Sequence, residues 1–396
     1  MASVIQQISA VTAMNLRSVP ERWGASLVVV VGIGGVVGVL VALLSMAQGF
    51  SATLASTGRD DRAIVLRGGS KDELGSVVYR EQAPIIADAP GVKKGADGKP
   101  LALLELYMLT DIAKQGDTTP NNVVVRGTSP NVFAVRSETR IVEGRMFQTG
   151  LREVVAGRGA QGQFANLKVG SQVEIRDGFW NVVGVFETGG DVHESELWVD
   201  ADVLSAAARR QAYNTITVQL ESAAAYQKFK DALTADPRLT VNVQKEPEYY
   251  ASRAKTLNDF ITILGYFVAV IMAVGAIFGA LNTMYVAVSA RSVEIATLRA
   301  IGFSGTPVVI SVLAESLLLA LTGGAIGAVV SYLIFNGYTV ATLNMQTFSQ
   351  VAFAFRVTPA LVQEGLLLAL LLGLVGGLFP AIRAARLPVV DALRAG

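Results

Sequence analysis

Four long runs of apolar residues divide the chain, and each is long enough to cross a lipid bilayer as a helix. The first run, Leu27 to Ala47, has 21 residues without a charge, and about 20 such residues span the hydrocarbon core. The apolar part of a cleaved signal peptide is only about 7–15 residues long, so we interpret this run as a retained span. The other three runs are Phe260 to Ala290, about Thr306 to Tyr338, and roughly Pro359 to Ala381.

The second run is longer than a bilayer requires. Its 31 uncharged residues would form a helix of about 46 Å, whereas the hydrocarbon core is about 30 Å thick. Either this helix is tilted or it projects beyond the membrane. Because the run directly follows a polar segment, we favour a projecting stalk that carries a soluble domain.

The polar segment between the first two runs, residues 50–255, has the pattern of a mixed α/β domain. Helices are predicted at Asp200–Arg210 and Ala223–Thr234. We expect one domain, or two subdomains, of roughly 200 residues. Short β-type runs bounded by Gly, Pro and Asn occur at Ala63–Leu66, Val123–Arg126, Val173–Ile175, Val182–Phe186 and Thr215–Leu220.

Charge follows the same division. Only 16% of all residues are charged, against about 25% in soluble domains, and residues 50–255 hold 25 of the 33 Lys+Arg and 26 of the 32 Asp+Glu. The net charge of −1 in this segment gives no electrostatic reason to expect nucleic-acid binding. The chain has no cysteine and one histidine, which excludes disulfides, thiolate metal sites and His-rich metal sites.

The segment before the first span reads as an amphipathic helix over residues 4–19. Its apolar side chains fall within one arc, opposite Gln6 and Arg17. Such a helix either lies along a membrane surface or packs on protein, and both alternatives stay open. The arc comprises Val4, Ile5, Ile8, Val11 and Leu16.

Arginines beside the spans predict the orientation, because cytoplasmic loops carry an excess of Lys and Arg. The short loop between the last two spans has only Arg356. Both termini are therefore expected in the cytoplasm, and the domain of residues 50–255 outside. The arginines on the cytoplasmic side are Arg17, Arg22, Arg291, Arg299, Arg383, Arg386 and Arg394.

Few residues are candidates for chemistry. The sequence contains no P-loop, H-E-x-x-H or G-x-S-x-G motif. The segment Asp191 to Glu196 could coordinate a cation, but a solvated loop is the simpler interpretation. Glu315 lies about nine residues into the third span, where an unpaired charge is costly. We interpret it as a helix–helix or interfacial contact ahead of a role in transport coupling, and we count it as the one ionisable group of the spans.

A charged stretch, Ser289 to Gly305, separates the second and third spans. Arg291 and Glu294 have the spacing of an ion pair on a helix, and Gly302 can end that helix in a left-handed cap. Ile295, Leu298 and Ile301 form an apolar stripe, with Arg299 pointing away from it. An exposed connector has no reason to present such a stripe to the cytoplasm, so we predict that it docks a partner.

Glycines four residues apart predict close helix packing within the membrane. The first pair is Gly34 and Gly38 in the first span. The same spacing recurs in the third and fourth spans, at Gly323 and Gly327 and at Gly373 and Gly377.

The motif R-S-V-E-I-A-T-L-R-A-I-G with a span on each side resembles the MacB/FtsX-like permeases of ATP-binding cassette (ABC) transporters. The segments M-N-L-R-S-V-P, L-S-M-A-Q-G-F, G-R-M-F, W-N-V-V-G-V-F-E and P-A-I-R-A-A-R-L-P-V-V-D-A-L-R also fit this family. The resemblance implies a dimer of four-span subunits, homomeric or heteromeric. It also implies that a cytoplasmic ATPase, which binds ATP and Mg²⁺, drives motions of the periplasmic domains.

The resemblance assigns ATPase coupling to Arg291, Glu294, Ile295, Leu298, Arg299 and Gly302. Some family members carry the ATPase as an N-terminal fusion. This chain begins at the amphipathic helix, so we expect the ATPase on a separate polypeptide and no cofactor bound by this chain. Expected partners are that ATPase, a second permease copy, membrane lipid and, for efflux, a periplasmic adaptor with an outer-membrane channel.

Together these patterns predict an integral membrane α+β protein of the bacterial inner membrane: four transmembrane helices with a large mixed α/β periplasmic domain inserted between helices 1 and 2. Efflux of a small molecule or peptide is the favoured function. Lipoprotein extraction, activation of a cell-wall hydrolase, and a membrane sensor are the alternatives. The expected segments are an amphipathic helix (1–23), spans at 24–49, 256–288 (with stalk), 306–338 and 359–381, the periplasmic domain (50–255), the coupling helix (289–305), a short periplasmic loop (339–358) and the C-terminus (382–396).

Overall fold

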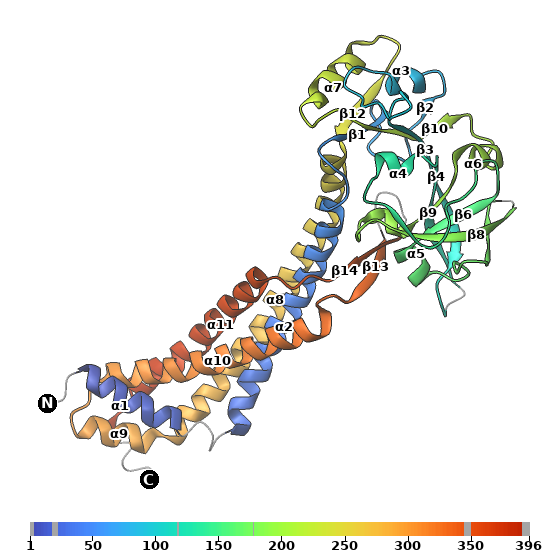
Figure 1. Ribbon diagram of the computed structural model, residues 1–396. Coiled ribbons are helices and arrows are strands. Elements are labelled where there is room, and N and C mark those ends of the chain that lie inside the picture. Colours follow the sequence, from blue (N-terminus) through green and yellow to red (C-terminus); the bar gives the residue numbers. More distant parts are fainter. Residues whose placement is uncertain (1–3, 18–22, 117–118, 177, 344–349, 390–396) are drawn as a thin grey trace. The chain divides into compact units, whose positions relative to one another are not determined.

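The computed structural model describes residues 4–17, 23–116, 119–176, 178–343 and 350–389. They form two compact units, which we describe separately. The helical unit comprises Met1–Gln48, Asp259–Tyr338 and Phe355–Gly396, and the sheet unit comprises Gly49–Asn258 and Thr339–Ala354 (Figure 1).

Within the described residues, four helices are long and apolar enough to cross a membrane. They are α2 (Trp23–Ala55), α8 (Glu246–Ala290), α10 (Gly305–Phe335) and α11 (Pro359–Ala385). Thr358 starts α11 by accepting a hydrogen bond from the Leu361 N–H, with Pro359 at the first helical position. The four predicted spans are thus helices, although α2 and α8 extend further into the chain than predicted.

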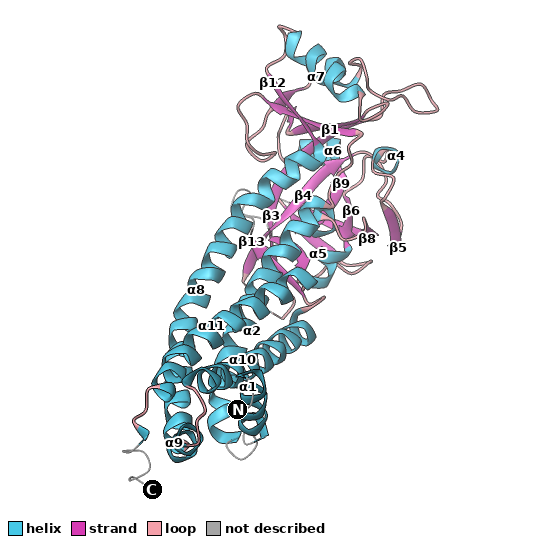
Figure 2. Cartoon of the chain, turned by 90° about the vertical axis from the view of Figure 1, so that its left-hand side faces the viewer, coloured by secondary structure: helices cyan, strands magenta, loops and turns pink. Residues whose placement is uncertain are grey.

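Helix α1 (Val4–Arg17) packs against α10, and the two lie side by side in Figure 2. In the predicted apolar arc of α1, Val11 is buried and Ile8 is half-buried. Protein packing therefore accounts for Val11 and Ile8, whereas the side chains of Val4, Ile5 and Leu16 lie outside the described residues. Arg22 and Arg394, two of the residues used to predict orientation, lie outside the described residues.

Helix α10 approaches α2 closely along glycines. A Cβ atom on Gly327 would lie only 2.2 Å from the carbonyl oxygen of Gly34, and one on Gly323 would lie 2.5 Å from that of Val30. Gly38 also faces this crossing, because its Cβ would lie 3.5 Å from the Gly327 carbonyl oxygen. Backbones this close exclude any side chain at Gly323 and Gly327.

A second glycine crossing joins α10 to α11. A Cβ atom on Gly373 would lie 2.5 Å from that of Ala320, and one on Gly377 would lie 2.6 Å from that of Ser316. The Ser316 hydroxyl donates a hydrogen bond of 2.7 Å to the Gly373 carbonyl oxygen. All six predicted packing glycines therefore lie where two helices meet.

The sheet unit is built on one mixed sheet, whose order among the described residues is β12-β1-β11-β3-β4-β9-β6-β8-β5, with β7 paired to β8 (Figure 2). Pairs β4–β9 and β6–β8 are parallel, and the other pairs are antiparallel. The strands are β1 (Arg62–Arg67), β3 (Ala102–Ala113), β4 (Pro120–Thr128), β5 (Arg140–Gly144), β6 (Glu153–Gly157), β7 (Gln172–Ile175), β8 (Gly178–Glu187), β9 (Glu196–Asp200), β11 (Thr215–Gln219) and β12 (Val241–Lys245).

Three apolar clusters pack on the described strands of this sheet, and two of them lie toward its opposite ends. Phe229 and Leu233 of α7 (Ala225–Ala235) pack on β1, β11 and β12. Trp180 belongs to the second cluster, which the strands β4, β6, β8 and β9 share. One continuous sheet with separate cores toward its two ends explains why the sequence pattern fitted both one domain and two subdomains.

Short elements complete the unit. The predicted helix Asp200–Arg210 is α6 (Ala201–Ala207), capped by the Asp200 carboxylate. The others are α3 (Ala83–Ala87), α4 (Val132–Val135), α5 (Arg158–Gln163), the turn η2 (Val192–Ser195) and the small strand pair β2 (Val78–Tyr79) with β10 (Ala212–Tyr213).

The segment 339–358, predicted as a short loop, contains two strands. Strands β13 (Thr339–Leu343) and β14 (Gln350–Ala354) form an antiparallel hairpin that belongs to the sheet unit; residues 344–349 lie outside the description. The Ala352 N–H donates to the Ser195 hydroxyl (2.9 Å), and the Gln350 amide donates to Asn121 (2.6 Å). The hairpin was missed because contacts with distant segments, such as those to Ser195 and Asn121, support the pairing of its two strands.

Candidate functional site

Helix α9 (Ser292–Ala300) is the charged segment between α8 and α10. It ends in a Schellman motif: the Phe303 N–H donates to the Leu298 carbonyl and the Gly302 N–H to that of Arg299, both at 3.1 Å. Gly302 has a φ of +99°, a conformation that costs glycine little and other residues more. The predicted left-handed cap is therefore present, and it turns the chain into α10.

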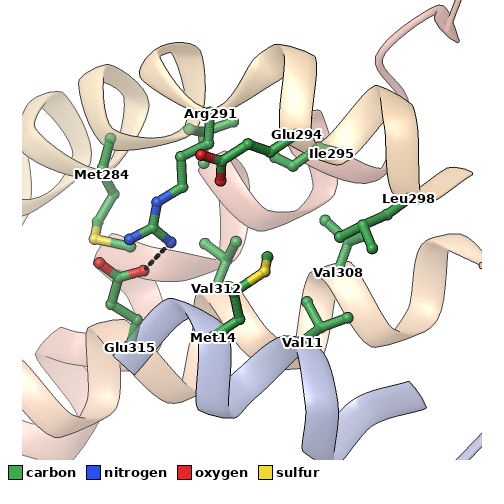
Figure 3. Close-up of a pocket in the computed structure, with 12 residues that line it drawn as sticks. Val11, Met14, Met284, Arg291, Glu294, Ile295, Leu298, Val308, Val312 and Glu315 are labelled. Atoms are coloured by element: carbon green, nitrogen blue, oxygen red, sulfur yellow. Dashed lines mark hydrogen bonds and ion pairs between the residues drawn. The ribbon is translucent and has the colours of Figure 1, made fainter. Parts of the chain in front are cut away.

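The inner face of α9 packs on its neighbours. Figure 3 shows Ile295 and Leu298 directed toward Val308 and Val312 of α10, with Val11 of α1 beside them. The cavity between these side chains has a volume of only about 20 Å³, which is room for water and not for a transport substrate.

The predicted apolar stripe of α9 is therefore wrong as a single docking face. Ile295 is 8% exposed and lies in a core cluster, whereas Ile301 is 69% exposed. Three residues fall short of a full helical turn by about 60°. Ile301 is two such steps beyond Ile295, so its side chain lies on another side of the helix.

Arg291 fastens the start of α9 to α10. Its Nη1 lies 3.2 Å from Oε2 of Glu315, and both side chains are almost entirely buried (Figure 3). The sequence suggested a pair between Arg291 and Glu294, but Glu294 is exposed. Glu315 thus makes a helix–helix contact, the interpretation favoured from the sequence. A charge buried near the end of a span is tolerable because it is paired.

Arg299 fastens the other end of α9 to α11. Its Nη1 donates hydrogen bonds to the carbonyl oxygens of Ala385 (2.8 Å) and Leu387 (2.9 Å). The last carbonyls of a helix have no partner within the helix and carry partial negative charge, so a guanidinium there is favourable. The two arginines therefore tie α9 to both neighbouring spans.

The outward face of α9 consists of other residues. Val293, Glu294 and Thr297 are exposed, as are Ala300 and Ile301 beyond them. Spacings of three and four residues place Val293, Thr297 and Ala300 on one side of the helix. We call these five residues the outer face of α9.

One ionisable residue of the spans was overlooked. Glu364 lies in α11, and it accepts a hydrogen bond from the Tyr266 hydroxyl of α8. The residue was visible in the sequence inside the predicted fourth span, so the count of one ionisable group there was wrong.

The segment Asp191–Glu196 is not a solvated loop. His193 and Asp191 are buried, and Asp191 accepts hydrogen bonds from the Thr188 hydroxyl and the His193 N–H. Among the described residues, no three His, Cys, Asp or Glu side chains are arranged to hold a metal ion. Burial raises the pKa of Asp191.

Glu196, at the end of that segment, accepts hydrogen bonds from Arg126 Nε (2.7 Å) and Nη2 (2.8 Å). Burial alone would raise the pKa of Glu196. The attraction of the Arg126 guanidinium outweighs burial and holds the pKa well below its ordinary value.

Comparison with known proteins identifies the family of this chain. Residues 25–236 match the model of the MacB-like periplasmic core domain, and residues 266–389 match the FtsX-like permease C-terminal model. The chain belongs to the MacB/FtsX-like permease family. The family consists of ABC-transporter permeases, and with its four candidate spans the chain is a multi-pass protein of the inner membrane.

Individual relatives share about a quarter of its residues. The uncharacterized ABC transporter permease YvrN of Bacillus subtilis is 24% identical over 421 residues, covering 96% of both chains. The macrolide export ATP-binding/permease protein MacB of Bdellovibrio bacteriovorus is 25% identical over 407 residues, covering 94% of this chain and 59% of that protein. The chain spans between 49% and 59% of several curated relatives.

A solved structure also matches part of the chain. The periplasmic region of MacB from Actinobacillus actinomycetemcomitans is 14% identical, with a TM-score of 0.37, and it covers 48% of this chain.

Proposed function

We propose that this chain is the permease subunit of an ABC transporter and that the outer face of α9 docks a separate cytoplasmic ATPase. The observation that carries the proposal is the two-sided character of α9. One side is tied to α10 and α11 by Arg291 and Arg299, while the other side, with Val293, Glu294 and Ile301, is exposed. A helix fastened in this way passes a push from a partner to both spans.

The orientation supports this assignment. Among the described arginines of the helical unit, Arg291 and Arg299 are in or beside α9 and Arg383 and Arg386 are at the end of α11, whereas Arg356 precedes α11. By the positive-inside rule we expect this end of the bundle in the cytoplasm. The sheet unit would then lie outside, where a transporter meets its cargo.

A separate ATPase is favoured because the alignment with the ABC transporter permease YvrN covers 96% of this chain and 96% of YvrN. In this proposal ATP and Mg²⁺ bind the ATPase, and two permease copies form the transporter. The spans then convert ATP-driven closure of the ATPases into motion of the sheet unit.

Efflux of a small molecule or peptide through a periplasmic adaptor is the transport task we propose. Its support is the name of the MacB relative, which is described as a macrolide export protein. Lipoprotein extraction and hydrolase activation remain the alternatives within the same family.

Two matched truncations in α9 test the docking face. Ile301→Ala removes an exposed side chain, so it should weaken binding of the ATPase and lower stimulated ATP hydrolysis while thermal stability stays unchanged. Ile295→Ala makes the same truncation inside the core, so it should lower the unfolding free energy by about 2–5 kcal/mol. The measurements are co-purification, hydrolysis and thermal unfolding with the stand-alone ABC ATPase encoded nearest to this gene. Undiminished binding of Ile301→Ala, Val293→Asp and Glu294→Lys would refute docking through this face.

A further inference from the structure

The first residue of α8 is a buried acid held by two buried arginines. Glu246 is fully inaccessible, and its carboxylate accepts a hydrogen bond from Arg62 Nε of β1 at 2.5 Å. Its other oxygen accepts from Nη1 of Arg136, the residue that ends α4. The start of α8 is therefore fixed to two separate segments of the sheet unit by charge.

The buried charges continue from there as a chain. Arg136 Nη2 lies 3.6 Å from Glu105 Oε2 of β3, and the same oxygen lies 3.3 Å from Arg126 Nη1 of β4. Arg126 in turn pairs with Glu73 (2.7 Å) and with Glu196 of β9 (2.7 Å). Opposite charges thus alternate without a break from the start of α8 to β9.

Such a chain is costly to open. Removing one member of a buried pair leaves an uncompensated charge in the interior, whereas an exposed pair such as Arg140 and Glu187 contributes little. The backbone reinforces the site, because Gly58, which follows α2, has a φ of +93°, and a Cβ there would lie 2.8 Å from Cγ of Glu246. An apolar contact would hold α8 in place as well, but it would permit sliding, since hydrophobic contact is not directional.

We propose that Glu246 is a positioning residue, the centre of a rigid joint through which α8 moves the sheet unit. This inference rests on the proposed function, in which the spans drive that unit. The ion pairs with Arg62 and Arg136 prevent α8 from turning independently at its first residue. The chain through Glu105 and Arg126 carries the same displacement to β9.

The joint can be tested in the full-length permease alone. The natural chain has no cysteine, so spin labels at Lys255→Cys on α8 and Ser222→Cys in the sheet unit report one distance. We expect a narrow distance distribution in the parent, loss of the narrow peak in Glu246→Gln, and an intermediate width in Glu246→Asp, which keeps the charge on a shorter side chain. Glu187→Gln, the same change at an exposed pair, should leave the peak unchanged.

A second label pair, Asp202→Cys with Lys228→Cys, lies wholly within the sheet unit and should stay narrow in every variant. A broad parent distribution, an unchanged peak in Glu246→Gln, or equal broadening of both label pairs would overturn the joint. With the ATPase and ATP added, Glu246→Gln should retain stimulated hydrolysis, and the α8 label pair of the parent should keep its narrow peak, because two labels joined rigidly move together. Failure of the parent to stimulate hydrolysis would instead count against the proposed function, and the distance result would still decide the joint.

Discussion

Replacing Glu315 by glutamine should destabilise the helical unit far more than a comparable change at the surface. The carboxylate lies 3.2 Å from Arg291, and the two side chains are 5% and 10% exposed. Breaking a pair at that depth costs about 3–5 kcal/mol, because the guanidinium of Arg291 stays buried after its attraction to this carboxylate is lost. A water-exposed pair contributes about 0–1 kcal/mol, so the two cases are separable by experiment.

The assay is unfolding of the purified permease in detergent, monitored by temperature or denaturant. Glu294→Gln is the matched control, since it makes the same change at an exposed carboxylate on α9 and should alter stability by less than about 0.5 kcal/mol. The double variant Arg291→Met/Glu315→Met should recover much of the loss, because it leaves no unpaired charge. Equal stability of Glu315→Gln and Glu294→Gln would refute the reasoning, and so would a double variant less stable than both single variants.

Three further results are expected. Gly327→Ala should separate α2 from α10 and lower the stability of the permease. Gly279→Ala, where the added carbon meets open space, should be neutral or slightly stabilising. Equal losses of stability in the two variants would contradict the close crossing of α2 and α10. The sheet unit should lose stability as the pH falls below about 4.5. The folded-state pKa of Glu196 lies below its ordinary value of 4.5, so the ionised carboxylate stabilises the fold above that pH and the stabilisation is lost on protonation. Unfolding measured against pH should show this dependence, and Glu196→Gln should flatten it. In whole cells, with any outer membrane permeabilised, an impermeant thiol reagent should label Ser222→Cys and not Thr297→Cys, and the reverse pattern would overturn the orientation.

Several features were correct from local pattern alone. Long apolar runs predicted α2, α8, α10 and α11, and glycines four residues apart predicted the crossings of α10 with α2 and α11. The cap at Gly302 followed from the residue type. Each of these depends on a preference that acts within a few turns of one helix: apolar length, side-chain size, or the φ that a residue tolerates.

The errors share a different origin. Arg291 was paired with Glu294, its neighbour on the helix, but its partner Glu315 is in the next span. Ile295 was assigned to a docking face because the sequence does not show that α1 and α10 cover it. The hairpin β13–β14 was taken for a loop because its stabilising partners, such as Ser195, are more than 150 residues away in the chain.

The sequence by itself determined which segments enter lipid, which segment stays in water, and the order in which they follow one another. These properties depend on the solvent that each residue prefers, and neighbouring residues reveal that preference. Only the tertiary structure decided which face of α9 is open, where Arg299 donates its hydrogen bonds, and how Glu246 joins a chain of buried charges. Those outcomes depend on pairs of groups brought together from distant segments, and the free energy of each pair exists only after both are buried.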